Sequence, residues 1–98
     1  MNINQKPEGD KLTLEIEGRI DTKAVPEMEA IIRNSLTDVK TLVIDLAKTV
    51  YISSAGLRVL LVAQKQMNKQ GEMTVIHVNE DLMEIFEVTG FTDILTIV

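Results

Sequence analysis

Apolar and polar residues alternate along residues 11–17, a pattern that predicts a strand with one buried face and one face in water. Gly18 is expected to end this strand. Residues 8–10, Glu-Gly-Asp, are typical of a turn, so residues 3–6 are predicted to form a short first strand in a hairpin. The chain is therefore expected to begin with two antiparallel strands.

A helical period follows the hairpin. Apolar residues recur at intervals of three and four, at Val25, Met28, Ile32 and Leu36, and this spacing predicts the buried stripe of a helix. Asp21 or Thr22 can cap this helix, and Pro26 lies near its first turn, where proline is tolerated. The helix is expected to end at about Leu36.

The middle of the chain predicts a second strand and helix. Residues 41–46 contain a continuous apolar run, which is typical of a central strand covered on both faces. Ser53 or Ser54 can cap the next helix, which is expected to run to about Lys69 and to stop at Gly71.

The C-terminal part repeats this alternation. Residues 73–78 predict a strand, Asn79 is expected to cap a helix that ends at Gly90, and residues 94–97 predict a last strand. The order ββαβαβαβ implies an α/β fold with a mixed, mostly parallel sheet and helical crossovers. Residues 1–98 are expected to form a single domain.

Composition narrows the function. The chain has 98 residues, of which 45% are hydrophobic, so it can build a core, and it has no cysteine for a disulfide or a thiolate metal site. We find no signal peptide and no apolar run near the ~20 residues of a membrane span, so a cytoplasmic protein is expected. The net charge of −5 disfavours nucleic acid and anionic lipid as partners, and it suits solubility or a partner with a basic patch.

The segment from Val50 to Leu61 joins a strand to a helix, where ligands and modifications often lie in α/β proteins. A phosphate on Ser53 or Ser54 would meet free helical N–H groups. The alternative is that the two serines only cap the helix. Arg58 is the only charged or polar side chain between Ala55 and Ala63, so this helix either exposes an apolar binding surface or is buried between two neighbours.

Several blocks of the chain resemble one bacterial family. The stretch from Asp45-Leu46 through Tyr51-Ile52-Ser53-Ser54-Ala55-Gly56-Leu57-Arg58 to Leu61 is similar to the characteristic segment of anti-sigma factor antagonists in the STAS domain family. Residues 14–21 resemble that family's second strand, Gly71-Glu72-Met73 follows at the family's spacing, and residues 82–91 resemble its C-terminal helix and turn. The resemblance covers essentially the whole chain and implies a STAS-like fold.

The resemblance also implies partner switching. In this family the unmodified protein binds an anti-sigma factor that is also a serine kinase, and binding releases a sigma factor. The kinase phosphorylates its antagonist on a serine at the helix N-terminus, which ends binding, and a metal-dependent serine phosphatase restores it. The chain is therefore expected to be a regulatory phosphoprotein and not an enzyme, without cofactor or metal.

Carried over by residue, the phosphorylated serine falls on Ser54. The family usually has Asp just before it, whereas this chain has Ser53, which removes a carboxylate and makes Ser53 a second, less favoured acceptor. The expected partner-binding residues are Asp21, Ser53, Ser54, Ala55, Gly56, Leu57 and Arg58. The resemblance places Asp21 near the serine loop, and a helix cap is its alternative role.

Two rival functions stay open. An enzyme could use Ser54, His77 and Asp45 or Asp21 as a triad, but a lone histidine within a predicted strand and the absence of a Walker-type loop argue against catalysis. STAS-like domains also serve, without phosphorylation, as scaffolds in stress-sensing complexes or as accessory subunits of lipid transporters, and the sequence is compatible with that role.

Overall fold

The computed structural model describes all 98 residues and contains one four-stranded sheet in the order β1-β2-β3-β4. β1 and β2 pair antiparallel, whereas β2, β3 and β4 pair in parallel. The strands are β1 (Asn2–Glu8), β2 (Lys11–Ile20), β3 (Thr41–Ile52) and β4 (Glu72–Ile76). The mixed, mostly parallel sheet predicted from the sequence is confirmed.

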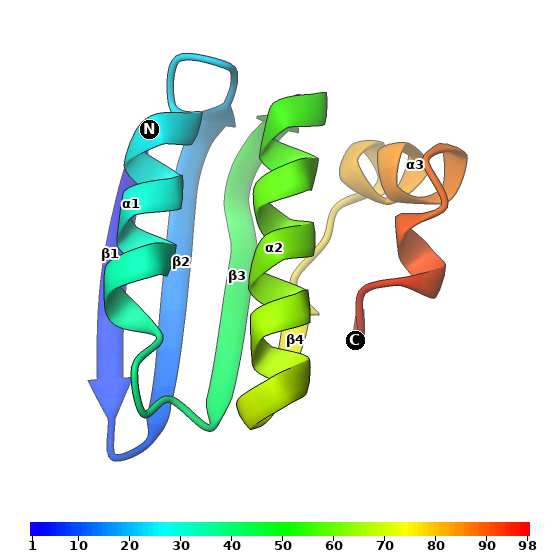
Figure 1. Cartoon of the computed structure of the whole chain (residues 1–98). Coiled ribbons are helices and arrows are strands. Elements are labelled where there is room, and N and C mark those ends of the chain that lie inside the picture. Colours follow the sequence, from blue (N-terminus) through cyan, green and yellow to red (C-terminus); the bar gives the residue numbers. More distant parts are fainter.

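Two helices cover one face of this sheet, and a third stands beside its β4 edge (Figure 1). Parallel neighbours need a crossover, and α1 and α2 supply one each. The helices are α1 (Val25–Ser35), α2 (Ser54–Gln70) and α3 (Glu80–Val88), and a short 3₁₀ turn follows at Phe91–Asp93. β3 therefore delivers the chain to the start of α2 at one end of the sheet, the upper end in Figure 1.

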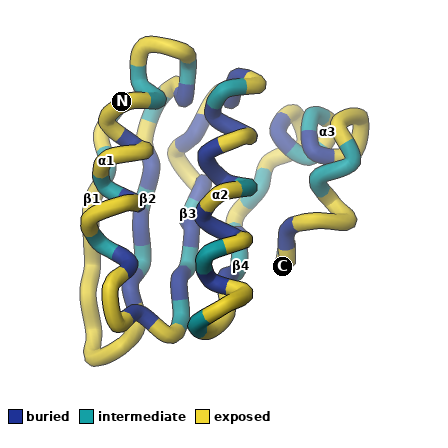
Figure 2. The backbone as a smooth tube through the Cα atoms, viewed as in Figure 1, coloured by how far each residue is buried: buried dark blue, intermediate teal, exposed yellow.

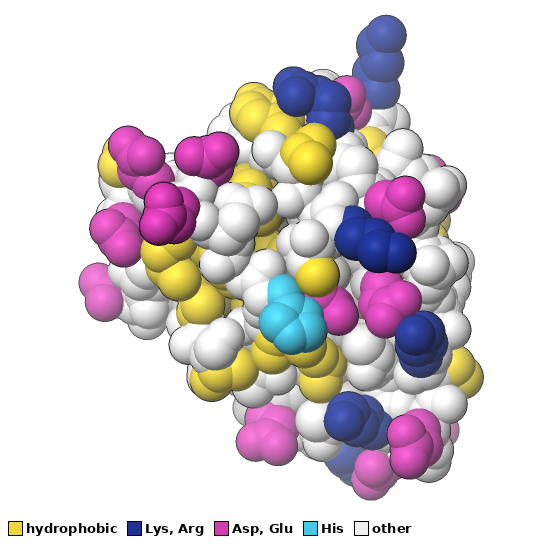
Figure 3. All heavy atoms as spheres, turned by 180° about the vertical axis from the view of Figure 1, so that it is seen from behind, with side chains coloured by type: hydrophobic (Ala, Val, Ile, Leu, Met, Phe, Trp, Pro, Cys, Tyr) yellow, Lys and Arg dark blue, Asp and Glu magenta, His cyan; other side chains and the backbone are white.

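The hydrophobic core lies between the sheet and the helices, where 22 apolar residues are buried in one cluster (Figure 2). The opposite face of the sheet is open to water and carries charged side chains (Figure 3). On it Lys6 pairs with Glu15 at 3.0 Å and His77 pairs with Asp45 at 2.8 Å. The prediction that the central strand is covered on both faces is therefore wrong, and Val43 is only half-buried.

β3 is longer than predicted because it contains two irregularities. It runs on to Ile52, and β2 continues through Gly18, which has φ +100°, to Ile20. The pairing steps from Glu15↔Asp45 to Glu17↔Lys48, and later from Gly18↔Thr49 to Arg19↔Tyr51. At both steps β3 contributes one residue more than β2, which is the count of a β-bulge. The alternation of buried and exposed residues is interrupted at these bulges, so the strand predicted from the sequence ended too early.

Two other boundaries differ from the prediction. α1 begins at Val25 because a separate turn comes first, in which the Asp21 carboxylate accepts the N–H of Ala24 at 3.0 Å. The predicted last strand over residues 94–97 makes only one parallel bridge, Val75↔Ile97, beside the edge of β4. The capping by Asn79 is confirmed, since its side chain accepts the N–H of Leu82 at 2.9 Å.

Candidate functional site

Ser53 forms the corner where β3 ends and α2 begins. Its extended backbone makes it the N-cap of α2, and its hydroxyl oxygen accepts the N–H of Gly56 at 3.1 Å. Its own N–H donates to the carbonyl of Ile20 at 2.8 Å, so the corner is tied to the end of β2. Only 8% of Ser53 is exposed. Its hydroxyl is thus buried and already used as a cap.

Ser54 has the opposite environment. It is the first residue of α2 and is exposed. The first turn of a helix presents backbone N–H groups without helical partners, and the helix dipole is positive there. Of the two serines, Ser54 is therefore the one that a modifying enzyme can reach, and a phosphate on it would lie at a favourable end of the helix.

Gly56 and Leu57 hold α2 against the sheet and do not face solvent. A Cβ added at Gly56 would come within 2.7 Å of Ile20 Cγ2 and 2.9 Å of Ile52 Cγ1, so the glycine allows the first turn to approach both strand ends. Leu57 is 4% exposed and belongs to the core. These two predicted binding residues, like Ser53, shape the site from beneath.

The solvent-facing part of the predicted set is smaller. Ser54 and Arg58 are exposed, and Ala55 and Asp21 are half-buried. Asp21 directly follows Ile20, whose carbonyl binds Ser53, so it lies beside the serine corner while its carboxylate caps the turn before α1. Its carboxylate therefore caps the turn before α1 and not α1 itself, whose N-cap is Ala24, and its role in partner binding stays a prediction.

Arg19 and Tyr51 were not predicted as neighbours of the site. They are paired across β2 and β3 close to the strand ends, and the Arg19 guanidinium lies 4.4 Å from the centre of the Tyr51 ring. This is cation–π geometry. The sequence offered one signal, because Tyr51 is the only tyrosine and directly precedes Ile52-Ser53.

His77 and Asp45 form a separate pair. His77 follows the end of β4 and has φ +59°. The prediction that it lies within a strand is therefore wrong. Partial burial alone would raise the pKa of Asp45, but the N–H of Ala47, the His77 ring and Lys6 outweigh it and hold the pKa below its ordinary value of 3.8. Asp45 precedes Ile52 by seven strand residues, or roughly 20 Å, so the structure does not bring Ser54, His77 and Asp45 together as a triad.

The structure shows no group of three or more His, Cys, Asp or Glu side chains placed to hold a metal ion. None of its helices combines the length and the apolar character that crossing a bilayer requires.

The family can now be stated. The family model described as STAS domain matches residues 2–98. The anti-sigma-B factor antagonist of Listeria monocytogenes is 30% identical over 102 residues, covering 99% of this chain and 90% of that protein. BtrV of Bordetella bronchiseptica, named as an anti-sigma factor antagonist, is 41% identical over 59 residues, which is 59% of this chain but only 51% of BtrV. The chain belongs to the STAS domain family.

Solved structures agree on the fold. SpoIIAA, an anti-sigma factor antagonist from Bacillus, superimposes in its unphosphorylated form with a TM-score of 0.78 at 13% identity, covering 99% of this chain and 87% of that one. Its phosphorylated form gives 0.77 at 14% identity, covering 99% and 91%. The family and fold expected from the sequence are confirmed.

Proposed function

We propose that this chain is an anti-sigma factor antagonist whose partner binding is controlled by phosphorylation of Ser54. The observation that carries the proposal is the division between the two serines. Ser53 is buried and caps α2, whereas Ser54 is exposed on the first turn. A relative that covers nearly all of this chain is an anti-sigma-B factor antagonist, and SpoIIAA exists in a phosphorylated form.

In the proposed cycle the unmodified chain binds an anti-sigma factor that is also a serine kinase, and a sigma factor is released in the cytoplasm. The kinase transfers the γ-phosphoryl group of ATP-Mg²⁺ to the Ser54 oxygen. The new O–P bond forms as the bond to the ADP oxygen breaks, and the hydroxyl proton passes to a base of the kinase. A serine phosphatase hydrolyses the phosphoserine and returns the chain to its binding form.

The magnitudes favour release over unfolding. A phosphoryl group adds about −1.5 to −2 charges at pH 7. Within the free chain the helix dipole stabilises this charge by about 0.3–1 kcal/mol. In a tight interface an unpaired buried charge costs about 2–5 kcal/mol, or about thirtyfold to several-thousand-fold in affinity. Phosphorylation should therefore leave the folded chain stable but weaken the complex, as a reversible switch requires.

We further propose that the chain binds and is modified but does not itself catalyse. This rests on the placement of Asp45 and His77 on the open face of the sheet, whereas Ser54 begins a helix on the other face (Figure 1, Figure 3). A serine nucleophile needs its base within hydrogen-bond reach, and Ser54 has no such neighbour in the His77–Asp45 pair.

The test is intact mass and peptide mapping after incubation with the purified anti-sigma kinase from the same organism and ATP-Mg²⁺. Wild type and Ser53→Ala should gain one phosphoryl group, and Ser54→Ala should gain none. In the same preparation Ser54→Asp should bind the kinase at least tenfold more weakly, while Ser54→Ala should keep its affinity. Label on Ser53, or full binding by Ser54→Asp, would overturn the proposal and favour a scaffold without phosphoregulation.

A further inference from the structure

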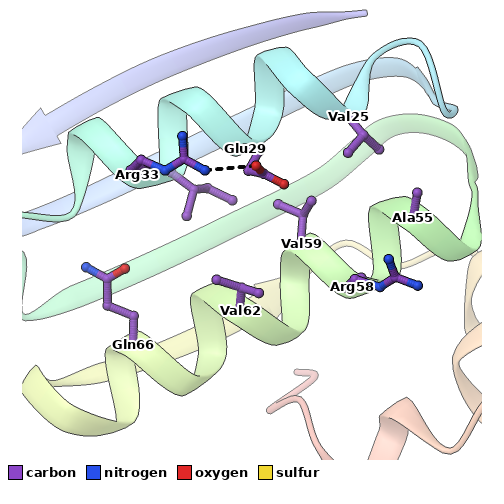
Figure 4. A pocket seen from close by; sticks show the side chains of 9 residues that line it. Val25, Glu29, Arg33, Ala55, Arg58, Val59, Val62 and Gln66 are labelled. Atoms are coloured by element: carbon purple, nitrogen blue, oxygen red, sulfur yellow. Dashed lines mark hydrogen bonds and ion pairs between the residues drawn. The ribbon is translucent and has the colours of Figure 1, made fainter.

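A groove of about 370 Å³ runs between α1 and α2 on the helical face of the molecule (Figure 4). Five of its nine lining residues are apolar: Val25 and Ile32 from α1, and Ala55, Val59 and Val62 from α2. Val62 is 53% exposed and is the only large apolar side chain on α1 or α2 among the strongly exposed ones. Ile32 and Val59 are buried and form the floor of the groove, Val25 and Ala55 are half-buried, and Val62 is the apolar side chain that the groove leaves exposed.

The groove continues directly from the proposed phosphorylation site. Ala55, the residue after Ser54, lines its end, and Arg58 lies one turn further along α2 (Figure 4). Val62 follows eight residues after Ser54, which is about 12 Å along the helix axis. A partner segment that covers both Ser54 and Val62 therefore has to span about this distance along α2.

The charges that line the groove are unbalanced at this end. Arg33 pairs with Glu29 at 2.9 Å, so these two side chains neutralise each other. The other two ion pairs of the chain are Lys6–Glu15 and His77–Asp45, which leaves Arg58 without an anionic partner. The groove therefore offers an apolar floor with one free guanidinium close to Ser54, and that charge is complementary to a carboxylate.

From these observations we infer that the groove docks a segment of the anti-sigma factor that carries apolar side chains and a carboxylate, with the carboxylate bound by Arg58. This inference rests on the proposed function and adds the chemistry of the partner. Ser54 and Arg58 are four residues apart, the spacing at which helical side chains meet. A phosphoryl group on Ser54 therefore competes with the partner's carboxylate for the same guanidinium, in addition to repelling it.

The test uses the full chain and the purified anti-sigma kinase of the same organism, with affinity measured by calorimetry. Val62→Gln should weaken binding about tenfold. Val88→Gln is the matched control, because Val88 is 81% exposed on α3 and lies outside the groove; it should stay within about twofold. Both variants change solvent-facing positions, and equal unfolding midpoints will verify that the fold is kept.

A second comparison tests Arg58. Arg58→Ala should weaken binding about tenfold, and the further loss caused by Ser54→Asp should be smaller in this background than in wild type, because the two positions are coupled. Equal losses in both backgrounds would remove Arg58 from the switch.

The outcomes separate this inference from the proposed function. If Val62→Gln binds like wild type while Ser54→Asp is released, the groove is not the docking site but the antagonist role stands. If Val62→Gln instead abolishes self-association seen by sedimentation without altering kinase affinity, the occupant is a second copy and the inference is wrong. A wild-type chain that does not bind the kinase would overturn both.

Discussion

At the scale of single residues, two adjacent serines have different roles because one helix boundary falls between them. The Ser53 hydroxyl replaces a missing helical acceptor for Gly56, and its burial ties it to the fold. Ser54 contributes an exposed hydroxyl one residue later. The local sequence pattern names both serines, because either can cap a helix, and only the family resemblance favoured Ser54; the structure adds that Ser53 has the extended backbone of the cap.

Ser53→Ala should therefore lower the free energy of unfolding by about 1 kcal/mol, within the 0.5–2 kcal/mol typical of a lost N-cap. Ser54→Ala should change it by less than about 0.5 kcal/mol, as expected for an exposed position. Urea unfolding of the two variants measures this difference. Equal losses in both would mean that the cap is shared.

Asp45 gives the molecule a specific acid sensitivity. Its pKa is depressed in the folded chain, so its ionised form stabilises the fold above the pKa of the unfolded chain, and that stability is lost as the pH falls through the lower folded pKa. The difference in unfolding free energy between wild type and Asp45→Asn should shrink as the pH falls from about 5 toward 2. In a His77→Gln background, which lacks the imidazole partner, the effect of Asp45→Asn on the unfolding free energy should depend less strongly on pH. A difference that grows on acidification would contradict this assignment.

At the scale of elements, the start of α2 positions the site through three contacts. Ser53 caps the helix, Gly56 allows it to approach Ile20 and Ile52, and Leu57 anchors it in the core. The end of α2 is fixed by another close approach, since a Cβ at Gly71 would overlap the carbonyl oxygen of Lys40. The same helix therefore presents Ser54, Arg58 and Val62 from a fixed position.

Element order could be predicted from the sequence because it depends on local periodicity and caps. The length of β3 could not, because each bulge shifts the alternation by one residue, and the buried positions after Leu46 become Thr49 and Ile52. The prediction of a strand in the C-terminal segment was wrong for a different reason. Its apolar residues suit a strand, but whether they pair along an edge depends on how Phe91–Asp93 turns after Gly90.

Leu95 shows what this segment contributes instead. It is 4% exposed and belongs to the core, whereas the neighbouring Ile94 is 43% exposed. Leu95→Ala should lower the unfolding free energy by about 2–5 kcal/mol, the range for truncation of a buried leucine. Ile94→Ala should cost clearly less in the same denaturant titration. If the order were reversed, Leu95 would not be the residue through which this segment contacts the core.

At the scale of the whole molecule, the two faces differ in kind. The helical face carries Ser54, Arg58 and the groove, and the open face of the sheet carries paired charges such as Lys6–Glu15 (Figure 3, Figure 4). The net charge of −5 belongs to both faces and cannot by itself direct a partner to one of them. The groove geometry could not be predicted from the sequence either, because it depends on how α1 and α2 pack.

Because the two faces differ, charge changes placed on each face can distinguish a local effect of phosphorylation from an effect of net charge. Lys48→Glu on the open face and Arg58→Glu beside the groove each lower the net charge by two units, at least as much as a phosphoryl group on Ser54, which adds about −1.5 to −2 charges. Arg58→Glu should weaken binding of the anti-sigma kinase at least tenfold, because it places a carboxylate where the partner's own carboxylate is expected. Lys48→Glu should stay within about twofold in the same calorimetric titration, since its charge faces the other side of the sheet. Equal losses would mean that the partner responds to total charge, and the switch would then need no defined docking surface around Ser54.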